Sequence, residues 1–449
     1  MIKINIKDQD LSHEIFELLR IYFPSREKEK DISANLEKNI LTIELDNKKY
    51  KINIENLDKN KVKKEILLIL KEKLENKINF GTLTGMRPTK KFLKLLENFD
   101  FDEAKKILKE DYLLSDEAIE MISMVGKNEM EILKEGKNKF SIYVHIPFCP
   151  SICKYCSFKT LVNKNNELIK NYVKFLIKEI KAFSNKKERP HSIYIGGGTP
   201  SAIGKENLKL ILEVLKESFL EPYEFTVECG RPETIDDEIL RTLKDFGVNR
   251  ISINPQTMND ETLKNIGRNH TSQDIIKAYE LTKNYNFIVN MDLIIGLPFE
   301  SHEMIINSLN KVLELKPQNI TIHTLALKRG SELMKEEFFE KNLNITFDEI
   351  GNIMLKNFYK PYYMYRQKRI LMDGQNIGWT LGGFPSIYNV VMIEEKESIL
   401  GFGMCASSKF LNFEEDRFEK FINFKDIKEY MTRIDEIIEK KKILQKNFL

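Results

Sequence analysis

Three of the chain's five cysteines stand close together in the stretch YVHIPFCPSICKYC, residues 143–156. Cys149, Cys153 and Cys156 have the spacing C-x3-C-x2-C. A structural zinc site needs four ligands, and the remaining cysteines offer no second C-x2-C pair. Three thiolates suit a [4Fe–4S] cluster in which one iron atom has no protein ligand. The spacing therefore predicts such a cluster, with an open iron that can bind a small molecule.

The composition excludes several classes of protein. The 71 Lys and Arg residues nearly balance the 68 Asp and Glu residues, so bulk charge gives no support for a nucleic-acid partner or an acidic membrane partner. We find neither a signal peptide nor an apolar run of 18 residues. Five cysteines among 449 residues are too few for a disulfide framework. We expect a cytoplasmic protein, in which Cys229 and Cys405 are buried structural residues.

The elements that must position the cysteines begin near residue 140. Six short β-branched runs alternate with amphipathic helical patterns, and the runs cover residues 140–148, 192–199, 224–230, 250–257, 287–298 and 319–327. This alternation predicts an α/β fold, a partial (β/α)6 parallel barrel. Polar and glycine residues gather where the runs end, at Cys149, GGGTP (196–200), Glu228, Gln256 and Asp292. The carboxyl edge of such a barrel holds the active site, so we expect these residues to meet there.

The sequence pattern divides the chain into four parts. Residues 1–80 predict a small α+β module, in which apolar residues alternate on either side of Asp46-Asn47 as in a hairpin. Residues 81–138 show helical periodicity alone and predict a helical connector. Residues 139–335 form the predicted barrel, and residues 336–449 form a C-terminal region that we expect to cover the substrate.

The motifs resemble those of a known superfamily. C-x3-C-x2-C after the first predicted strand, with GGGTP after the second, resembles the radical S-adenosylmethionine enzymes. In these enzymes S-adenosylmethionine chelates the open iron, and its reductive cleavage gives a 5′-deoxyadenosyl radical. YIGGGTPSAI, TVECGRPETID, RISINPQTMNDETLKNIGRNHT and NMDLIIGLP are similar to the oxygen-independent coproporphyrinogen III oxidase group. TGMRPTKKFLKLL, ITIHTLALKRGS and YYMYRQKR are most similar to its coproporphyrinogen dehydrogenase (HemZ-type) branch.

The resemblance implies which residues bind the cofactors. The cluster ligands are the three cysteines of the motif. The positions matched to the S-adenosylmethionine on the cluster are Tyr143, Tyr155, Gly197, Gly198, Thr199 and Glu228. The positions matched to a second S-adenosylmethionine are Gln256, Arg268, Asp292 and Ala326. GFGMCASS (401–408) resembles a glycine-rich segment that closes over the site.

The resemblance also implies an activity. It is the oxidative decarboxylation of two propionates of coproporphyrinogen III, which gives protoporphyrinogen IX in haem biosynthesis. A reduced flavodoxin or ferredoxin would donate the electron, and no side chain would be catalytic beyond the cluster and cofactor. Because arginine suits planar carboxylates, we expect Arg329 and Arg366 to anchor the substrate's propionates.

One departure from the family pattern leaves two alternatives open. The well-known oxidases have a further cysteine two residues after the third, where this chain has Phe158 after Ser157. The related haem chaperones also lack that cysteine. The alternatives to coproporphyrinogen oxidation are a non-catalytic haem carrier, which this departure supports, and radical-driven opening of haem, which is known among relatives of the group.

Overall fold

The computed structural model describes residues 2–23, 32–54, 58–74, 78–162, 165–326, 330–334, 347–367, 374–412 and 417–448. The chain forms two compact units, which we call the N-terminal unit (Met1–Lys127 and Met364–Gln375) and the barrel unit (Asn128–Tyr363 and Asn376–Leu449). The two units are defined by the contacts within each of them, whereas the four parts predicted from the sequence are defined by secondary-structure pattern. The four-part division stays a prediction.

The N-terminal unit contains a four-stranded sheet in the order β1-β2-β3-β4. Its strands are β1 (Ile2–Asn5), β2 (Ile32–Glu37), β3 (Ile40–Leu45) and β4 (Lys48–Asn53). Helices α1 (Gln9–Tyr22) and α2 (Lys59–Leu70) contribute to one apolar core with the sheet, and η2 (Lys71–Lys73) follows α2. Asp46 and Asn47 have φ of 52° and 61°, as the tight turn between β3 and β4 requires, so the predicted hairpin is confirmed.

Helices follow the sheet of the N-terminal unit. They are α3 (Pro88–Leu95), α4 (Phe101–Glu110) and α5 (Asp116–Glu135), the last of which continues into the barrel unit. Asp100 caps α4 by accepting a hydrogen bond from the amide of Glu103, and Pro88 occupies the first turn of α3. Among the described helices, none is long and apolar enough to cross a membrane.

The middle of the described sheet in the barrel unit consists of six parallel strands that are neighbours in chain order. They are β5 (Phe140–Ile146), β8 (Ser192–Gly197), β9 (Glu224–Glu228), β10 (Arg250–Ser252), β11 (Ile288–Ile295) and β12 (Asn319–Thr324). Each strand pairs with the next in chain order. Their side chains alternate between apolar residues on one face and polar or aromatic residues on the other, for example Ile142 and Val144 against Tyr143 and His145. The predicted β–α repeat and parallel sheet are confirmed.

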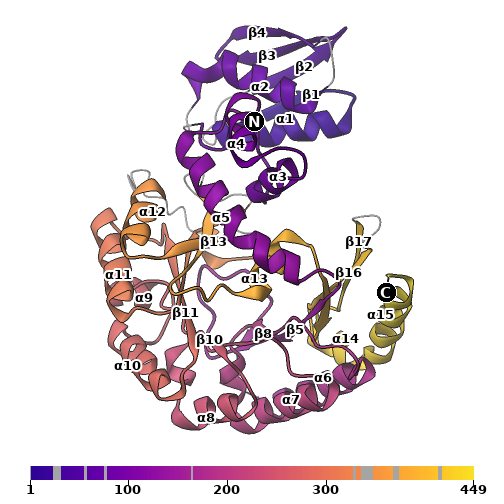
Figure 1. Ribbon diagram of the computed structural model, residues 1–449, viewed down its shortest axis with the longest axis vertical. Coiled ribbons are helices and arrows are strands. Elements are labelled where there is room, and N and C mark those ends of the chain that lie inside the picture. Colours follow the sequence, from indigo (N-terminus) through magenta and orange to yellow (C-terminus); the bar gives the residue numbers. More distant parts are fainter. Residues whose placement is uncertain are drawn as a thin grey trace. The chain divides into compact units, whose positions relative to one another are not determined.

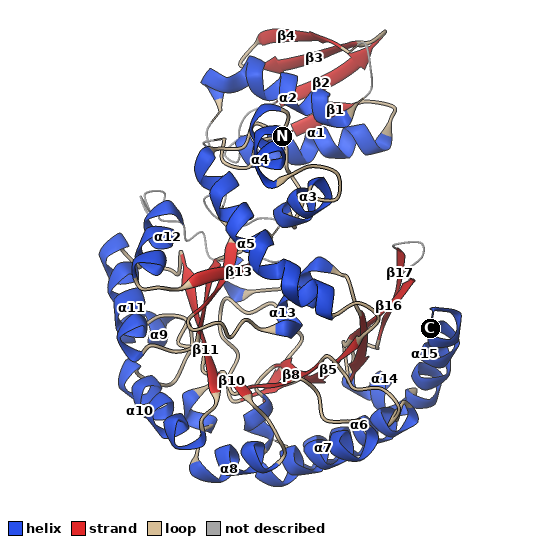
Figure 2. Cartoon of the chain, in the orientation of Figure 1, coloured by secondary structure: helices blue, strands red, loops and turns tan. Residues whose placement is uncertain are grey.

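Helices cover the convex face of the curved sheet (Figure 1; Figure 2). They are α6 (Asn166–Ala182), α7 (Lys205–Ser218), α8 (Asp237–Asp245), α9 (Asp260–Asn265), α10 (Ser272–Thr282), α11 (His302–Leu315) and α12 (Phe347–Lys356). The single-turn elements are η3 (Pro200–Ile203), η4 (Pro232–Thr234), η5 (Lys283–Tyr285) and η6 (Glu332–Met334). Asn165, Asp236 and Ser301 cap α6, α8 and α11 through their side chains. These caps fix where each helix begins after its strand.

The C-terminal part of the chain extends the sheet at both edges. Its elements are β13 (Lys360–Tyr365), β14 (Asn376–Thr380), α13 (Ile387–Glu394), β15 (Ser398–Phe402), β16 (Ser407–Asn412), β17 (Arg417–Ile422), α14 (Ile427–Thr432) and α15 (Ile434–Phe448). β14 runs antiparallel to β12, whereas β15 runs parallel to β5. The edge strands of the described sheet are therefore β13 and β17, and the barrel is partial, as predicted.

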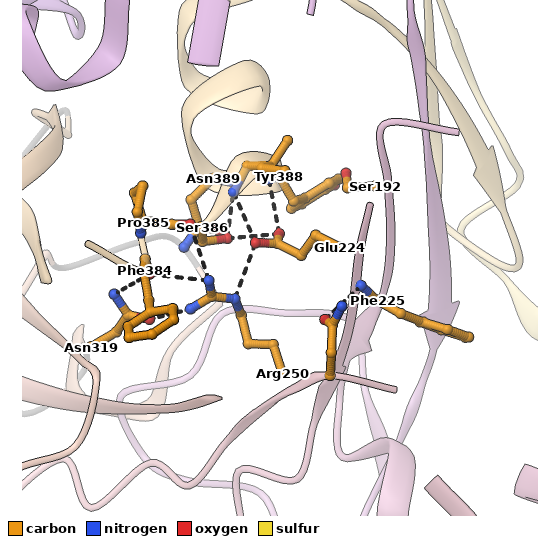
Figure 3. A network of polar contacts seen from close by, with 12 residues as sticks. Ser192, Glu224, Phe225, Arg250, Asn319, Phe384, Pro385, Ser386, Tyr388 and Asn389 are labelled. Carbon is orange, nitrogen blue, oxygen red and sulfur yellow. Dashed lines mark hydrogen bonds and ion pairs between the residues drawn. The ribbon is translucent and has the colours of Figure 1, made fainter. Parts of the chain in front are cut away.

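Helix α13 lies on the concave side of the curved sheet (Figure 1). Glu224, the first residue of β9, accepts hydrogen bonds from the Ile387 and Tyr388 amides at 2.9 and 3.0 Å. Arg250, the first residue of β10, donates to Glu224 at 3.0 Å and to the carbonyls of Phe384 and Pro385 (Figure 3). This buried ion pair fixes the start of α13 at the amino ends of the strands.

Candidate cofactor site at the carboxyl edge of the barrel

The three cysteines lie on the loop that follows β5. All three are partly exposed, and Cys149 ends the short strand β6 (Phe148–Cys149), which pairs with β7 (Leu161–Val162). The loop is held from several sides by its backbone. The Lys154 amide donates to the carbonyl of Ile266 at 3.0 Å, and the Lys154 carbonyl accepts from the amide of Leu333 at 3.1 Å. These two hydrogen bonds fasten the middle of the cysteine loop to neighbouring segments.

Two buried arginines, Arg231 and Arg268, flank this loop. The sequence predicted a role for Arg268 alone. Arg231 donates to Cys153 Sγ at 3.1 Å and to Ser151 Oγ at 2.7 Å. Arg268 donates to Tyr155 Oη at 3.0 Å and to two backbone carbonyls at 2.6 and 2.7 Å. Each arginine is 4% exposed. The guanidinium groups thus hold the second cysteine and the aromatic residue beside it.

The glycine turn after β8 runs against the cysteine loop. A Cβ on Gly198 would lie 3.0 Å from Cys149 Sγ, and one on Gly196 would lie 2.8 Å from Glu228 Oε2. Gly197 has φ of 106°, and a Cβ there would meet the ring of His145. The Thr199 amide donates to the Phe148 carbonyl, and its hydroxyl lies 3.7 Å from Cys149 Sγ. Only glycine permits this close approach of the two strand ends.

Glu228 ends β9 on the concave side, beside that glycine turn. It accepts a hydrogen bond from the Tyr194 hydroxyl and another from the Gly197 amide at 3.2 Å. Burial raises the pKa of Glu228 to about 7, against the lowering effect of the Tyr194 hydrogen bond, and the charge of Asp292 raises it further. Glu228 can therefore gain or lose a proton near neutral pH.

Stacked aromatic rings form a floor beneath Glu228. Tyr194 stacks on Tyr388 of α13 with ring centroids 4.4 Å apart, and Tyr143 stacks on Tyr388 at 6.0 Å. The Tyr143 hydroxyl lies 3.1 Å from His145 Nδ1. Burial lowers the pKa of His145 to about 4, so this imidazole is neutral. The floor separates the site from the polar network around Glu224 at the other end of the barrel.

The residues matched to a second S-adenosylmethionine meet only in part. The Gln256 amide donates to the Asp292 carbonyl at 2.8 Å, which places these two residues side by side. Asp292 accepts from Asn290 at 2.7 Å, and its other oxygen is 3.8 Å from His323 Nε2. Gln256 is 8% exposed, and its side-chain oxygen has no partner among the described residues. Arg268 instead holds Tyr155, as described above, and Ala326 follows β12 by two residues.

The remaining predicted residues lie elsewhere or outside the described part. Arg329 falls outside the described residues. Arg366 belongs to the N-terminal unit, is 5% exposed, donates to the Leu83 carbonyl at 3.1 Å and stacks on the Phe80 ring.

The glycine-rich segment 401–408 crosses the carboxyl end of β15. Gly403 contacts the backbone of His145, because a Cβ there would lie 2.6 Å from the His145 carbonyl oxygen. The Gly403 amide donates to Glu179, which forms a fully buried ion pair with Lys441 of α15. Cys405, in the same segment, has φ of 62° and is partly exposed, so the expectation that it is buried was wrong; Cys229 is buried as expected. The segment lies beside β5, and its role in closing the site stays a prediction.

Sequence reasoning missed Arg231, Tyr194 and Tyr388. Arg231 stands three residues after Glu228, at a strand end where the other candidates were found, so its position was a usable signal. Tyr194 is an inward-facing residue of a strand that was recognised. Tyr388 gave no signal, because only the return of the chain into the barrel brings α13 beneath the site.

These residues fit a cluster of the predicted kind. Within the described ranges, no three His, Cys, Asp or Glu side chains converge on one metal ion. The ligands of a [4Fe–4S] cluster need not converge on one ion, because each thiolate binds a different iron atom. One loop carries all three thiols, and the glycine turn beside it leaves room that a Cβ would fill. The donor set and the cradle therefore match the group.

Comparison with known proteins supports the same assignment. The family model for the Radical SAM superfamily matches residues 143–312. The oxygen-independent coproporphyrinogen-III oxidase-like protein HemZ of Bacillus subtilis (strain 168) is 37% identical over 382 residues, 81% of this chain and 76% of HemZ. The heme chaperone HemW of Lactococcus lactis subsp. lactis (strain IL1403) is 35% identical over 278 residues, 60% of this chain and 69% of HemW.

A solved structure supports the fold alone. Coproporphyrinogen III oxidase (HemN) from Escherichia coli has a TM-score of 0.54 to this chain at 21% identity, over 69% of this chain and 72% of that chain. The cofactors of the superfamily are a [4Fe–4S] cluster and S-adenosylmethionine, and the prediction of these cofactors is confirmed. The chain belongs to the radical S-adenosylmethionine superfamily, in the family of oxygen-independent coproporphyrinogen-III oxidase-like proteins.

Proposed function

We propose that this protein catalyses the oxygen-independent oxidative decarboxylation of coproporphyrinogen III to protoporphyrinogen IX. The observation that carries the proposal is the similarity to HemZ, which spans 382 residues and extends well beyond the 170-residue match to the superfamily, residues 143–312. The proposal includes a cytoplasmic location and a reduced flavodoxin or ferredoxin as the electron donor. The choice of electron donor follows from the need to reduce the cluster at low potential.

In this proposal Cys149, Cys153 and Cys156 hold the cluster. When bound, the cluster and S-adenosylmethionine would supply reductive cleavage of the sulfonium and removal of a hydrogen atom from the β-carbon of a substrate propionate. A separate one-electron acceptor would take the electron that remains when carbon dioxide leaves. Glu228 binds polar groups of S-adenosylmethionine through its ionised carboxylate, and Tyr155 packs on the nucleoside, oriented by Arg268. The aromatic floor of Tyr143, Tyr194 and Tyr388 excludes water from below.

A second S-adenosylmethionine is a further part of the proposal. Gln256 and Asp292 support it, because they are adjacent and the Gln256 side-chain oxygen is buried without a partner among the described residues. Arg268 gives less support, since it already donates to Tyr155 and to two carbonyls. Equilibrium dialysis of the reconstituted protein measures the stoichiometry. A value of one in the wild type would contradict the second site and leave the first intact.

The decisive experiment compares two substrates under anaerobic conditions. Reconstituted protein is incubated with S-adenosylmethionine, a reductant and either coproporphyrinogen III or haem, and 5′-deoxyadenosine and carbon dioxide are measured. We expect both products with coproporphyrinogen III and neither with haem. Deoxyadenosine formed with haem but without carbon dioxide would support haem opening instead.

A haem carrier is the second candidate, and two observations favour it. The chain is 35% identical to a heme chaperone, and it has Phe158 where the well-known oxidases have a further cysteine. In that case haem would bind to the protein, and neither substrate would stimulate deoxyadenosine formation. The same experiment therefore separates all three functions.

The cysteine assignment is tested by counting iron. We expect Cys149→Ala, Cys153→Ala and Cys156→Ala each to lose the reconstituted cluster, measured as bound iron and as the visible absorbance of the cluster. Cys229→Ala and Cys405→Ala are matched controls that should keep it, because these thiols belong to other elements. Full iron content in Cys153→Ala would defeat the assignment.

Arginine anchors for the propionates remain part of the proposal. Arg329→Ala should raise the Michaelis constant for coproporphyrinogen III and leave slow, substrate-free cleavage of S-adenosylmethionine unchanged. The same measurement on Arg366→Ala decides whether that residue contributes, since its buried contacts give it a structural task of its own.

A further inference from the structure

Arg231 contacts a predicted cluster ligand directly, and nothing in the reaction proposed above uses it. Its Nη1 donates to Cys153 Sγ at 3.1 Å, and its Nη2 donates to Ser151 Oγ at 2.7 Å. Both contacts lie on the cysteine loop, whereas Arg231 follows β9. The side chain of Arg231 is 5% exposed. A cationic donor is therefore aimed at one thiol from a neighbouring strand end.

A second layer holds this guanidinium in place. Arg231 Nε donates to Glu233 Oε1 at 2.9 Å, and Glu233 Oε2 lies 2.9 Å from His270 Nδ1. Burial raises the pKa of Glu233, but the hydrogen bond with His270 and the charge of Arg231 together lower it to about 2. Glu233 is therefore an anion that joins Arg231 to His270, with one carboxylate oxygen on each. The guanidinium cannot turn away from Cys153 without losing both partners.

The cysteines differ in their donors. Cys149 Sγ faces the Thr199 hydroxyl at 3.7 Å, a neutral and long contact. Cys153 Sγ faces a guanidinium at 3.1 Å, a charge-assisted contact. Hydrogen bonds to the sulfur atoms and nearby charges are among the factors that set the reduction potential of an iron–sulfur cluster. Reduction adds negative charge to the cluster, so a cationic donor stabilises the reduced state.

We propose that Arg231 is a positioning residue that raises the reduction potential of the cluster by hydrogen bonding to the thiolate of Cys153. Glu233 and His270 orient it from behind. The proposal rests on the assignment of Cys153 as a cluster ligand, and it adds to that assignment a residue through which this chain makes its cluster easier to reduce.

The test is a redox titration of the full-length reconstituted protein without S-adenosylmethionine, followed by electron paramagnetic resonance of the reduced cluster. In Arg231→Met, which keeps a long side chain and removes the donors, we expect a tenfold lower ratio of reduced to oxidised cluster at a given potential. For a one-electron couple this equals a shift of about 59 mV to more negative potential. Arg231→Lys keeps the positive charge and loses the planar set of guanidinium donors. Its reduction potential should shift in the same direction by a smaller amount.

Arg241→Met is the matched control, because Arg241 is an exposed residue of α8 that pairs with Asp237 four residues away and with Tyr285. Its potential should equal that of the wild type. Iron content and circular dichroism are measured on every variant. An unchanged potential in an iron-replete Arg231→Met overturns the proposal, and so does folded protein without iron in both Arg231 variants, which would make Arg231 a residue of cluster retention. A wild type without a cluster would instead defeat the cysteine assignment itself.

Discussion

Glu228 and Glu233 stand five residues apart and have opposite electrostatics. Glu228 lies inside the barrel beside Asp292, and its pKa rises to about 7 because burial outweighs the hydrogen bond from Tyr194. Glu233 has two cationic or donor partners, Arg231 and His270, and its pKa falls to about 2. The environment therefore lets Glu228 gain or lose its proton near neutral pH and keeps Glu233 ionised.

We predict that binding of S-adenosylmethionine strengthens as the pH rises through about 7. Glu228 becomes ionised over that interval, and its carboxylate attracts the cationic cofactor. Asp292, His323 and Tyr194 also face Glu228, so the midpoint depends on them. Tyr194→Phe removes a donor that lowers this pKa, and the midpoint should move to higher pH. Affinity is measured by equilibrium dialysis across pH 6–9, a range of about three units around the midpoint.

Glu228→Gln is the control for that prediction. It should bind more weakly at high pH by the worth of a charge-assisted hydrogen bond, about 1.5–3 kcal/mol, and show little dependence on pH. A wild-type affinity that does not change across the interval would contradict the role of Glu228, whereas iron content should be unaffected in either case.

Glu300 gives a prediction about stability. It is 1% exposed beside a small cavity lined by Gln256 and Leu293, and burial raises its pKa to about 7 although Thr257 donates to it. The unfolded chain ionises this group at lower pH than the folded protein, so stability falls as the pH rises from about 4.5 to about 7. Glu300→Gln carries no charge and should avoid this loss, which is on the order of 3 kcal/mol. Thermal unfolding of both proteins at pH 5 and pH 8 measures it; an equal decline in the two would contradict the account.

Helix α13 shows how elements distant in sequence position the site. The Glu224–Arg250 pair fixes the start of the helix, and the helix presents Tyr388 to Tyr194, which donates to Glu228. A chain of contacts thus runs from the amino end of the barrel to the candidate cofactor site. Figure 3 shows how many polar groups converge on that ion pair.

Loss of Glu224 should therefore destabilise the barrel unit. Glu224→Ala leaves the Arg250 guanidinium buried without its anion and removes both acceptors at the start of α13. Removal of one partner from a buried pair costs about 3–5 kcal/mol. Glu238→Ala is the control, because its ion pair with Lys205 is exposed and should be worth less than about 1 kcal/mol. Denaturant unfolding compares them, and equal effects would show that the α13 contacts contribute little.

Each of the two compact units is built from two separate segments of the chain. Met364–Gln375 belong to the N-terminal unit, although more than 230 residues separate them from Lys127. Arg366 shows the consequence, since its backbone amide donates to the Met86 carbonyl and its side chain packs on Phe80. The N-terminal unit is therefore completed by a segment that returns from the barrel.

We predict that Arg366→Ala lowers the stability of the N-terminal unit by about 1–3 kcal/mol, because a buried donor and a cation–π contact are lost. Iron content should stay at the wild-type level, since the three cysteines lie in the barrel unit. Hydrogen exchange of β1–β4 and iron analysis of the same sample measure both effects. If hydrogen exchange is unchanged and the Michaelis constant for coproporphyrinogen III is raised, Arg366 binds the substrate as the sequence predicted.

The sequence by itself determined the cysteine spacing, the six β–α units and the strand ends at which polar residues gather. These features are local, because periodicity and motif spacing depend on neighbours in the chain. Only the tertiary structure decided that Arg231 meets Cys153, that Arg268 holds Tyr155, and that Arg366 is buried in another unit. It also decided that α13 enters the barrel to place Tyr388 beneath Glu228. The physical reason is that such contacts join residues far apart in the chain, and no local pattern records which partner a long cationic or aromatic side chain will find.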